Sequence, residues 1–87
     1  GLHWRSGQLR HPAAVAASAA QRRAGLPLSA AVHDADEIAR AEALGVDDLV
    51  LGPVKPTATH PGHPGLGWAA FEALRALTSL PVHALGG

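Results

Sequence analysis

The sequence predicts an α/β protein with a parallel sheet, built as part of a (β/α)8 TIM barrel. Short apolar runs alternate with helix-forming stretches along the 87 residues, and turn residues separate them. No domain boundary or low-complexity linker interrupts this order. Strands that alternate with helices pair in parallel through right-handed crossovers. Because the expected strands and helices are short, a barrel is favoured over a doubly wound sheet.

The first part of the sequence predicts a strand, a helix and a second strand. The apolar run at 2–4 is the shortest expected strand. The alanine-rich stretch at 13–24 is strong helix-forming material, with Pro12 suited to be the first residue of the helix and Gly25 to terminate it. The apolar run at 28–32 predicts the next strand, which completes a β-α-β unit.

A second helix is expected at 36–44. Asp34, followed three positions later by Glu37, resembles a capping box, and Gly45 is suited to end the helix. The apolar residues of this segment recur at helical spacing and share one face, which is expected to pack on the sheet. They are Ile38, Ala41 and Leu44.

The second half predicts a strand, a long loop, a helix and a last strand. The run at 49–51 predicts a buried strand, and the loop at 52–65 contains four prolines and three glycines. The helix is expected at 67–77 and the last strand at 81–85. Four apolar residues of that helix are expected to point toward the core: Trp68, Phe71, Leu74 and Leu77.

The composition provides little material for a core. Apolar residues make up 47% of the chain, but 19 of them are the small residue alanine. Three residues are aromatic and none is cysteine. An 87-residue domain of this kind, without disulfides, would be marginally stable. We therefore expect residues 1–87 to be a fragment of a single barrel domain, with the rest of the barrel outside this sequence.

The charge balance argues against two classes of partner. Seven basic and seven acidic side chains give a formal charge of zero with no run of like charge, so we expect no nucleic acid and no anionic membrane surface as a partner. No segment is long and apolar enough to span a membrane, and no signal-peptide pattern is seen. The expected localisation is cytoplasmic.

The sharpest catalytic candidate is His33. In parallel α/β architectures the functional groups gather where strands end, and His33 follows the strand at 28–32. If the strand alternates regularly, His33 shares a face with Ser29 and Ala31 and projects into the mouth of the barrel, where a histidine can transfer protons. The alternative is that His33 only helps to cap the helix that begins near Asp34.

The loop after the third expected strand is the second candidate. The loop at 52–63 is longer than the usual β-α connection of about 2 to 6 residues. The hydroxyls of Thr57 and Thr59, with Lys55 or His60, could bind a phosphate. The alternative is an inert loop stiffened by proline. Gly86 and Gly87 follow the last strand, where unhindered backbone N–H groups can also bind phosphate.

The other histidines receive no metal role. His60 and His63 lie in a Pro-Gly loop with no third ligand nearby in the sequence, so no metal site is expected there. His83 alternates with Val82 and Ala84 and is expected to face the helix layer.

Taken together, these segments resemble the thiamine phosphate synthase and thiazole tautomerase (TenI-like) family. The resemblance follows the order and approximate spacing of the family's motifs along the whole chain. Its blocks are Gly1-Leu2-His3-Trp4, Ala31-Val32-His33-Asp34 with Glu37, Leu51-Gly52-Pro53-Val54 with Pro56-Thr57-Ala58-Thr59-His60, Gly65-Leu66-Gly67-Trp68, and Ala84-Leu85-Gly86-Gly87.

The resemblance implies a barrel of which this chain supplies about the fourth to seventh β/α units. Synthases of this family join a hydroxymethylpyrimidine diphosphate to a thiazole phosphate with Mg2+ and release diphosphate. By resemblance, the thiazole phosphate, or a related small phosphorylated ligand, would be bound by residues of the loop and of the last turn. These are Thr57, Ala58, Thr59, His60, Gly86 and Gly87.

Three departures from the family pattern fall at the diphosphate site. Ala31 replaces a serine, His60 replaces a lysine, and Gln8 falls where the family has a metal-binding aspartate, which argues against bound Mg2+. His33 matches the proton-transfer histidine of the tautomerase branch, which needs no metal-bound diphosphate. The resemblance therefore favours a tautomerase-like barrel over an intact synthase. The alternative is a non-catalytic ligand-binding or regulatory barrel fused to another enzyme, such as an upstream Nudix domain, and residues 1–87 by themselves are expected to be inactive.

Overall fold

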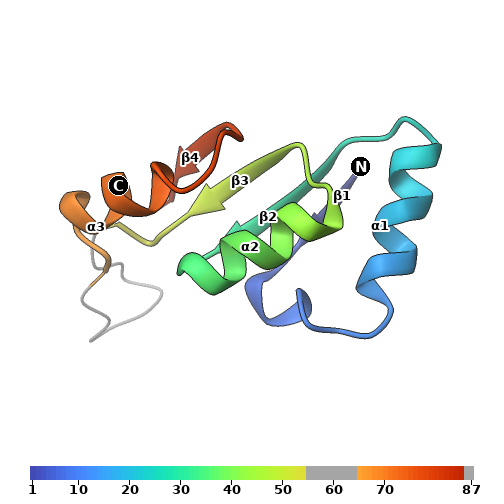
Figure 1. Cartoon of the computed structure of the whole chain (residues 1–87), viewed down its shortest axis with the longest axis horizontal. Helices are drawn as coiled ribbons and strands as arrows, with labels where there is room; N and C mark the ends of the chain where they lie inside the picture. The colour runs from blue at the N-terminus through green and yellow to red at the C-terminus, as the bar shows by residue number, and fades with distance from the viewer. Residues whose placement is uncertain (55–64, 86–87) are drawn as a thin grey trace.

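The computed structural model describes residues 1–54 and 65–85 (Figure 1). Strands and helices alternate along the described residues in the predicted order, with a short 3-10 helix added after the first strand. In chain order the elements are β1 (Leu2–Trp4), the 3-10 helix η1 (Ser6–Gln8), α1 (Ala14–Arg23), β2 (Leu28–Val32), α2 (Ala35–Leu44), β3 (Asp48–Leu51), α3 (Trp68–Arg75) and β4 (Val82–Ala84).

The four strands form one parallel sheet in the order β1-β2-β3-β4 (Figure 1). Each strand therefore pairs with the next strand of the chain, and a helix lies in each connection. This is the repeated β-α-β pattern that the alternation of apolar runs and helical stretches predicted. The predicted parallel α/β architecture is confirmed.

The strand register separates the two faces of the sheet. Ala30 pairs with Leu49 and Val32 with Leu51, and all four side chains are buried. Val50, which lies between the two leucines and points to the other face, is only half-buried. The helices therefore cover one face of the sheet, as they do in the wall of a barrel, and the opposite face is more open among the described residues.

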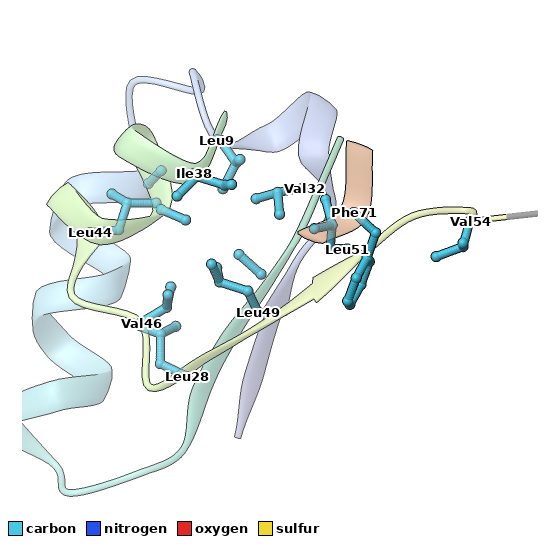
Figure 2. Packing of buried hydrophobic residues seen from close by; sticks show 13 residues of the cluster. Leu9, Leu28, Val32, Ile38, Leu44, Val46, Leu49, Leu51, Val54 and Phe71 are labelled. Atoms are coloured by element: carbon cyan, nitrogen blue, oxygen red, sulfur yellow. The ribbon is translucent and has the colours of Figure 1, made fainter. Parts of the chain in front are cut away.

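Helix α2 provides much of the helix side of the core (Figure 2). Ile38 and Leu44 point from α2 toward Val32 and Leu49 of the sheet, in the same buried cluster. Ala41, between them on the helix, is also fully buried, so the predicted apolar face of α2 is confirmed. Its small side chain lets the helix approach the sheet closely, which explains how an alanine-rich sequence can fill this layer.

Helix α1 is joined to the sheet by a polar contact. The Trp4 indole N–H donates to the hydroxyl of Ser18, which is fully buried in α1, over 2.8 Å. The helix ends at Arg23, and Gly25 in the turn that follows has a positive φ of 70°, which lets the N–H groups there bond back to the last turn. The predicted role of Gly25 is confirmed, because the Leu26 N–H donates to the Gln21 carbonyl over 3.1 Å.

The start of α2 is only half of a capping box. Asp34 is the N-cap, and its side chain accepts the Glu37 N–H at 2.8 Å, as predicted. The Glu37 carboxylate, however, accepts the N–H of His33, one residue earlier than the reciprocal bond of a capping box requires. Gly45 ends the helix with φ 77°, in the left-handed region. The helix boundaries were thus readable from the sequence, whereas the destination of the Glu37 side chain was not.

The predicted apolar face of α3 is wrong at two of its four positions. Phe71 is buried and Leu74 is half-buried, but the side chains of Trp68 and Leu77 are 51% and 57% exposed. Trp68 is the first residue of the helix and packs edge-on against the Phe71 ring, with centroids 5.5 Å apart, so it covers the core from outside. The helix ends at Arg75, so Leu77 lies in the following turn and does not continue the helical face.

None of the helices in residues 1–54 and 65–85 is long and apolar enough to cross a membrane.

Candidate functional site

The carboxyl ends of β1, β2 and β3 lie at the same edge of the parallel sheet. The residues that immediately follow these strands are Arg5, His33 and Gly52. Because the Gly52 N–H donates to the Val32 carbonyl over 3.4 Å, the start of the long loop lies directly beside the end of β2. The strand-end edge therefore brings His33 next to the base of that loop.

The His33 ring is held in place by Glu37. Its Nδ1 lies 3.1 Å from Glu37 Oε1, and the same oxygen accepts the His33 backbone N–H at 2.6 Å. The chain bends at His33, and the ring contacts the first turn of α2 instead of simply extending the row of Ser29 and Ala31. The two interpretations of His33 are therefore not exclusive, because its backbone takes part in the cap while its ring, 46% exposed, stands at the edge.

The base of the long loop is fixed by hydrogen bonds between its two ends. The Leu66 N–H donates to the Pro53 carbonyl and the Gly67 N–H to the Val54 carbonyl, both over 2.8 Å. The peptide bond before Pro53 is cis, and both Pro53 and Val54 are buried. The chain thus leaves the sheet and returns to it at one place.

The same place is tied to the end of β4. The Leu85 N–H donates to the Leu51 carbonyl over 3.0 Å, and the Leu85 carbonyl accepts the Val54 N–H at 2.9 Å. The loop base and the residue that precedes Gly86 are therefore direct neighbours, although more than 30 residues separate Leu51 from Leu85 in the sequence.

The predicted phosphate-binding residues lie outside the described part of the chain. They are Thr57, Ala58, Thr59, His60, Gly86 and Gly87. Lys55 and His63, the other candidates considered in the loop, also lie outside the described residues. What the structure brings together are the described residues on both sides of 55–64 and the residue before Gly86, at the strand-end edge that also carries His33.

The position suggested for a metal ligand, Gln8, does not fit Mg2+. Its uncharged side-chain oxygen already accepts the Arg5 N–H at 2.9 Å, at the end of η1. On α2, the carboxylate of Asp36 accepts hydrogen bonds from Arg10 and Arg40. These bonds, chiefly the one from Arg10, hold the pKa of Asp36 below its ordinary value. Mg2+ prefers free carboxylate oxygens, so the donors described at this edge suit it poorly.

The open face of the sheet carries a polar group that the sequence interpretation missed. His3 Nδ1 lies 2.7 Å from the Ser29 hydroxyl, and His83 Nε2 lies 3.2 Å from Asp48 Oδ2. The register aligns Ser29 with His3 on one side and with Asp48 on the other, so the two pairs lie in one row across the sheet.

The expectation that His83 faces the helix layer is wrong. The register pairs His83 with Val50, on the open face, whereas its neighbours Val82 and Ala84 pair with the buried Leu49 and Leu51. The signal was present in the sequence, because two apolar neighbours that face the helices leave the residue between them on the opposite face.

Comparison with known proteins identifies the family. Residues 4–87 match the family described as TMP-TENI, thiamine monophosphate synthase. A thiamine-phosphate synthase of Parasynechococcus marenigrum (strain WH8102) is 38% identical over 63 residues, which are 72% of this chain and 18% of that protein. The chain thus spans less than a fifth of the length of this relative. No solved structure matches. The chain belongs to the thiamine monophosphate synthase family, and its parallel sheet is part of the (β/α)8 barrel of that family.

Proposed function

We propose that this chain supplies part of a thiamine-pathway barrel that binds a thiazole phosphate and acts more like a tautomerase than a synthase, with His33 as general acid and base. The observation that carries the proposal is the His33–Glu37 pair beside the base of the 55–64 loop. A half-exposed histidine fixed at the strand-end edge has the position and the chemistry for proton transfer to a bound ligand.

The phosphate of the ligand is assigned to Thr57, Ala58, Thr59 and His60. Two hydroxyls, backbone N–H groups and an imidazole can each donate to phosphate oxygens. Both flanks of this segment are anchored beside Leu85, the residue that precedes Gly86 in the sequence. We therefore assign Gly86 and Gly87 to the same phosphate. These assignments support a ligand held between the loop and the end of β4.

The residues at the diphosphate site favour tautomerisation over synthesis. Gln8 supplies no carboxylate for Mg2+, Ala31 supplies no hydroxyl, and His60 replaces a permanent cation. A synthase must stabilise a diphosphate leaving group, whereas a tautomerase moves a proton within one ligand and needs no metal for it.

His33→Ala tests the acid and base role in the full-length natural protein. Thiazole phosphate isomerisation should fall by about 10²- to 10⁴-fold, the usual contribution of a positioned acid or base. His11→Ala is the matched control, because His11 is exposed and its ring accepts the Ala13 N–H away from the His33–Glu37 pair. If His33→Ala isomerises the ligand as fast as the control does, His33 has no catalytic role.

Thr57→Ala with Thr59→Ala tests the phosphate assignment. Each lost hydrogen bond to a charged group contributes roughly 1.5–3 kcal/mol, so affinity for thiazole phosphate should fall by at least about tenfold. Thr78→Ala is the control, because Thr78 bonds Glu42 at the other end of the helices. Unchanged affinity in the double variant would refute the phosphate assignment, and tight binding without turnover in the parent protein would favour the regulatory alternative.

A further inference from the structure

One oxygen of Glu37 bonds both the backbone and the ring of His33. The carboxylate Oε1 accepts the His33 N–H at 2.6 Å and lies 3.1 Å from His33 Nδ1. The Glu37 side chain is 19% exposed, whereas the Glu72 carboxylate, which pairs with an arginine on α3, is 59% exposed. Glu37 is therefore drawn into the edge of the fold, where a competing water is less able to replace its contact with the ring.

The contact determines which ring nitrogen carries the hydrogen. A carboxylate has no hydrogen to donate, so a hydrogen bond between it and a neutral imidazole requires the hydrogen on Nδ1. Nε2 of His33 then keeps its lone pair, and none of the hydrogen bonds among the described residues occupies that nitrogen.

Several contacts fix the backbone of Glu37 in the first turn of α2. Its backbone N–H donates to Asp34 Oδ1 over 2.8 Å, and the next residue, Ile38, is buried against the sheet. On its other side, Asp36 is bonded by both Arg10 and Arg40, which connects the first turn of α2 with the segment after η1. These contacts hold the backbone turn from which the Glu37 side chain reaches the ring, and those of Ile38 and Asp36 do so without Asp34.

We propose that Glu37 is the positioning residue of the proposed proton transfer: it holds His33 as the Nδ1–H tautomer, so that Nε2 is the nitrogen that exchanges the proton with the ligand. This rests on the function proposed above. Nε2 takes a proton from the ligand, the electron pair of the broken bond stays in the π system of the ligand, and the imidazolium is stabilised by the Glu37 carboxylate at Nδ1. The same Nε2–H then returns the proton to a second atom of the ligand, so no other reactant is consumed.

The first test measures the tautomer, independently of activity. In the full-length natural protein labelled with 15N-histidine, the His33 ring nitrogens at pH 8 should report the Nδ1–H form. Glu37→Ala should move His33 toward the Nε2–H form, and Glu37→Gln, whose side-chain oxygen can still accept from Nδ1–H, should preserve the Nδ1–H form. An unchanged tautomer in Glu37→Ala would overturn the inference.

The second test separates positioning from stability of the helix start. Glu37→Ala should lower kcat for thiazole phosphate isomerisation by on the order of 10²-fold, with KM little changed. A wrong histidine tautomer lowers kcat by up to ~10⁴-fold in serine proteases, so this expectation lies within the known range. Asp34→Ala is the matched control, because it removes the N-cap of the same helix without removing the group at Nδ1. It should lower the urea midpoint but retain the tautomer and most of kcat.

The outcomes distinguish the two proposals. If Glu37→Ala lowers kcat no more than Asp34→Ala does, Glu37 acts only in the cap and the positioning role is wrong. If His33→Ala is fully active, the proposed function itself fails. If His33→Ala is inactive while Glu37→Ala retains the kcat of the parent, only the positioning role is refuted.

Discussion

Truncating Ile38 should remove the main attachment of α2 to the sheet. The side chain is 2% exposed and lies in the cluster between α2 and the strands (Figure 2). Ile38→Ala deletes three buried carbons, which at ~0.8 kcal/mol each is about 2.4 kcal/mol of lost burial. The cavity left behind adds to this loss, and the higher helix propensity of alanine offsets a few tenths of a kcal/mol. We therefore expect the free energy of unfolding to fall by about 3 kcal/mol, inside the usual range of roughly 2–5 kcal/mol.

Urea unfolding of the full-length natural protein, followed by circular dichroism at 25 °C, measures this loss. Ile38→Val should cost about 1 kcal/mol, which makes a graded series. Val15→Ala is the control, because Val15 on α1 is 70% exposed and its truncation should change stability by less than about 0.5 kcal/mol. If Ile38→Ala costs no more than Val15→Ala, α2 is not packed on the sheet through Ile38 and the reasoning about its apolar face is wrong.

Three further substitutions test the caps, the loop base and the charged surface. Gly45→Ala should lower the free energy of unfolding by about 1–2 kcal/mol, because φ at this position is +77°. Gly7→Ala is the control in the same urea titration and should be neutral, because the new Cβ meets open space. Equal effects of the two substitutions would contradict the left-handed cap. Gly52→Ala would bring a Cβ within 2.6 Å of the Leu85 carbonyl oxygen, so it should cost about 1–3 kcal/mol and weaken thiazole phosphate binding; a variant with parental stability and affinity would argue against the close contact at the loop base. Asp36 has a lowered pKa in the folded state, so its stabilisation is present above the ordinary carboxyl value of 3.8 and is lost as the pH falls through the folded pKa. The difference in urea midpoint between the parent and Asp36→Asn should therefore be full at pH 7 and shrink in acid below pH 3.8, and a difference independent of pH would show that the two arginines do not act on its charge.

The sequence determined the order of the elements and most of their boundaries. Alternating apolar runs and helical stretches predicted the parallel sheet, and Gly25, Asp34 and Gly45 marked helix ends where the structure has them. These signals are local, because a cap or a helix face depends on residues within about one turn. The buried face of α2 was readable for the same reason.

Part of the candidate site was also readable from the sequence. Strand ends, a long loop and His33 were enough to predict the edge of the sheet at which functional groups gather. The family resemblance then predicted which residues of that edge bind phosphate, and those residues stay predictions because they lie outside residues 1–54 and 65–85.

Only the tertiary structure decided which groups meet. The Glu37 carboxylate reaches His33 and not the N–H of Asp34, the ends of the long loop close on each other beside Leu85, and His83 turns away from the helices toward Asp48. The closure beside Leu85 and the direction of His83 depend on strand pairing between residues far apart in the sequence. The Glu37 contact depends on the bend of the chain at His33, which the helix pattern does not state. Periodicity states which residues share a face, but the pairing of strands decides which partner each face receives.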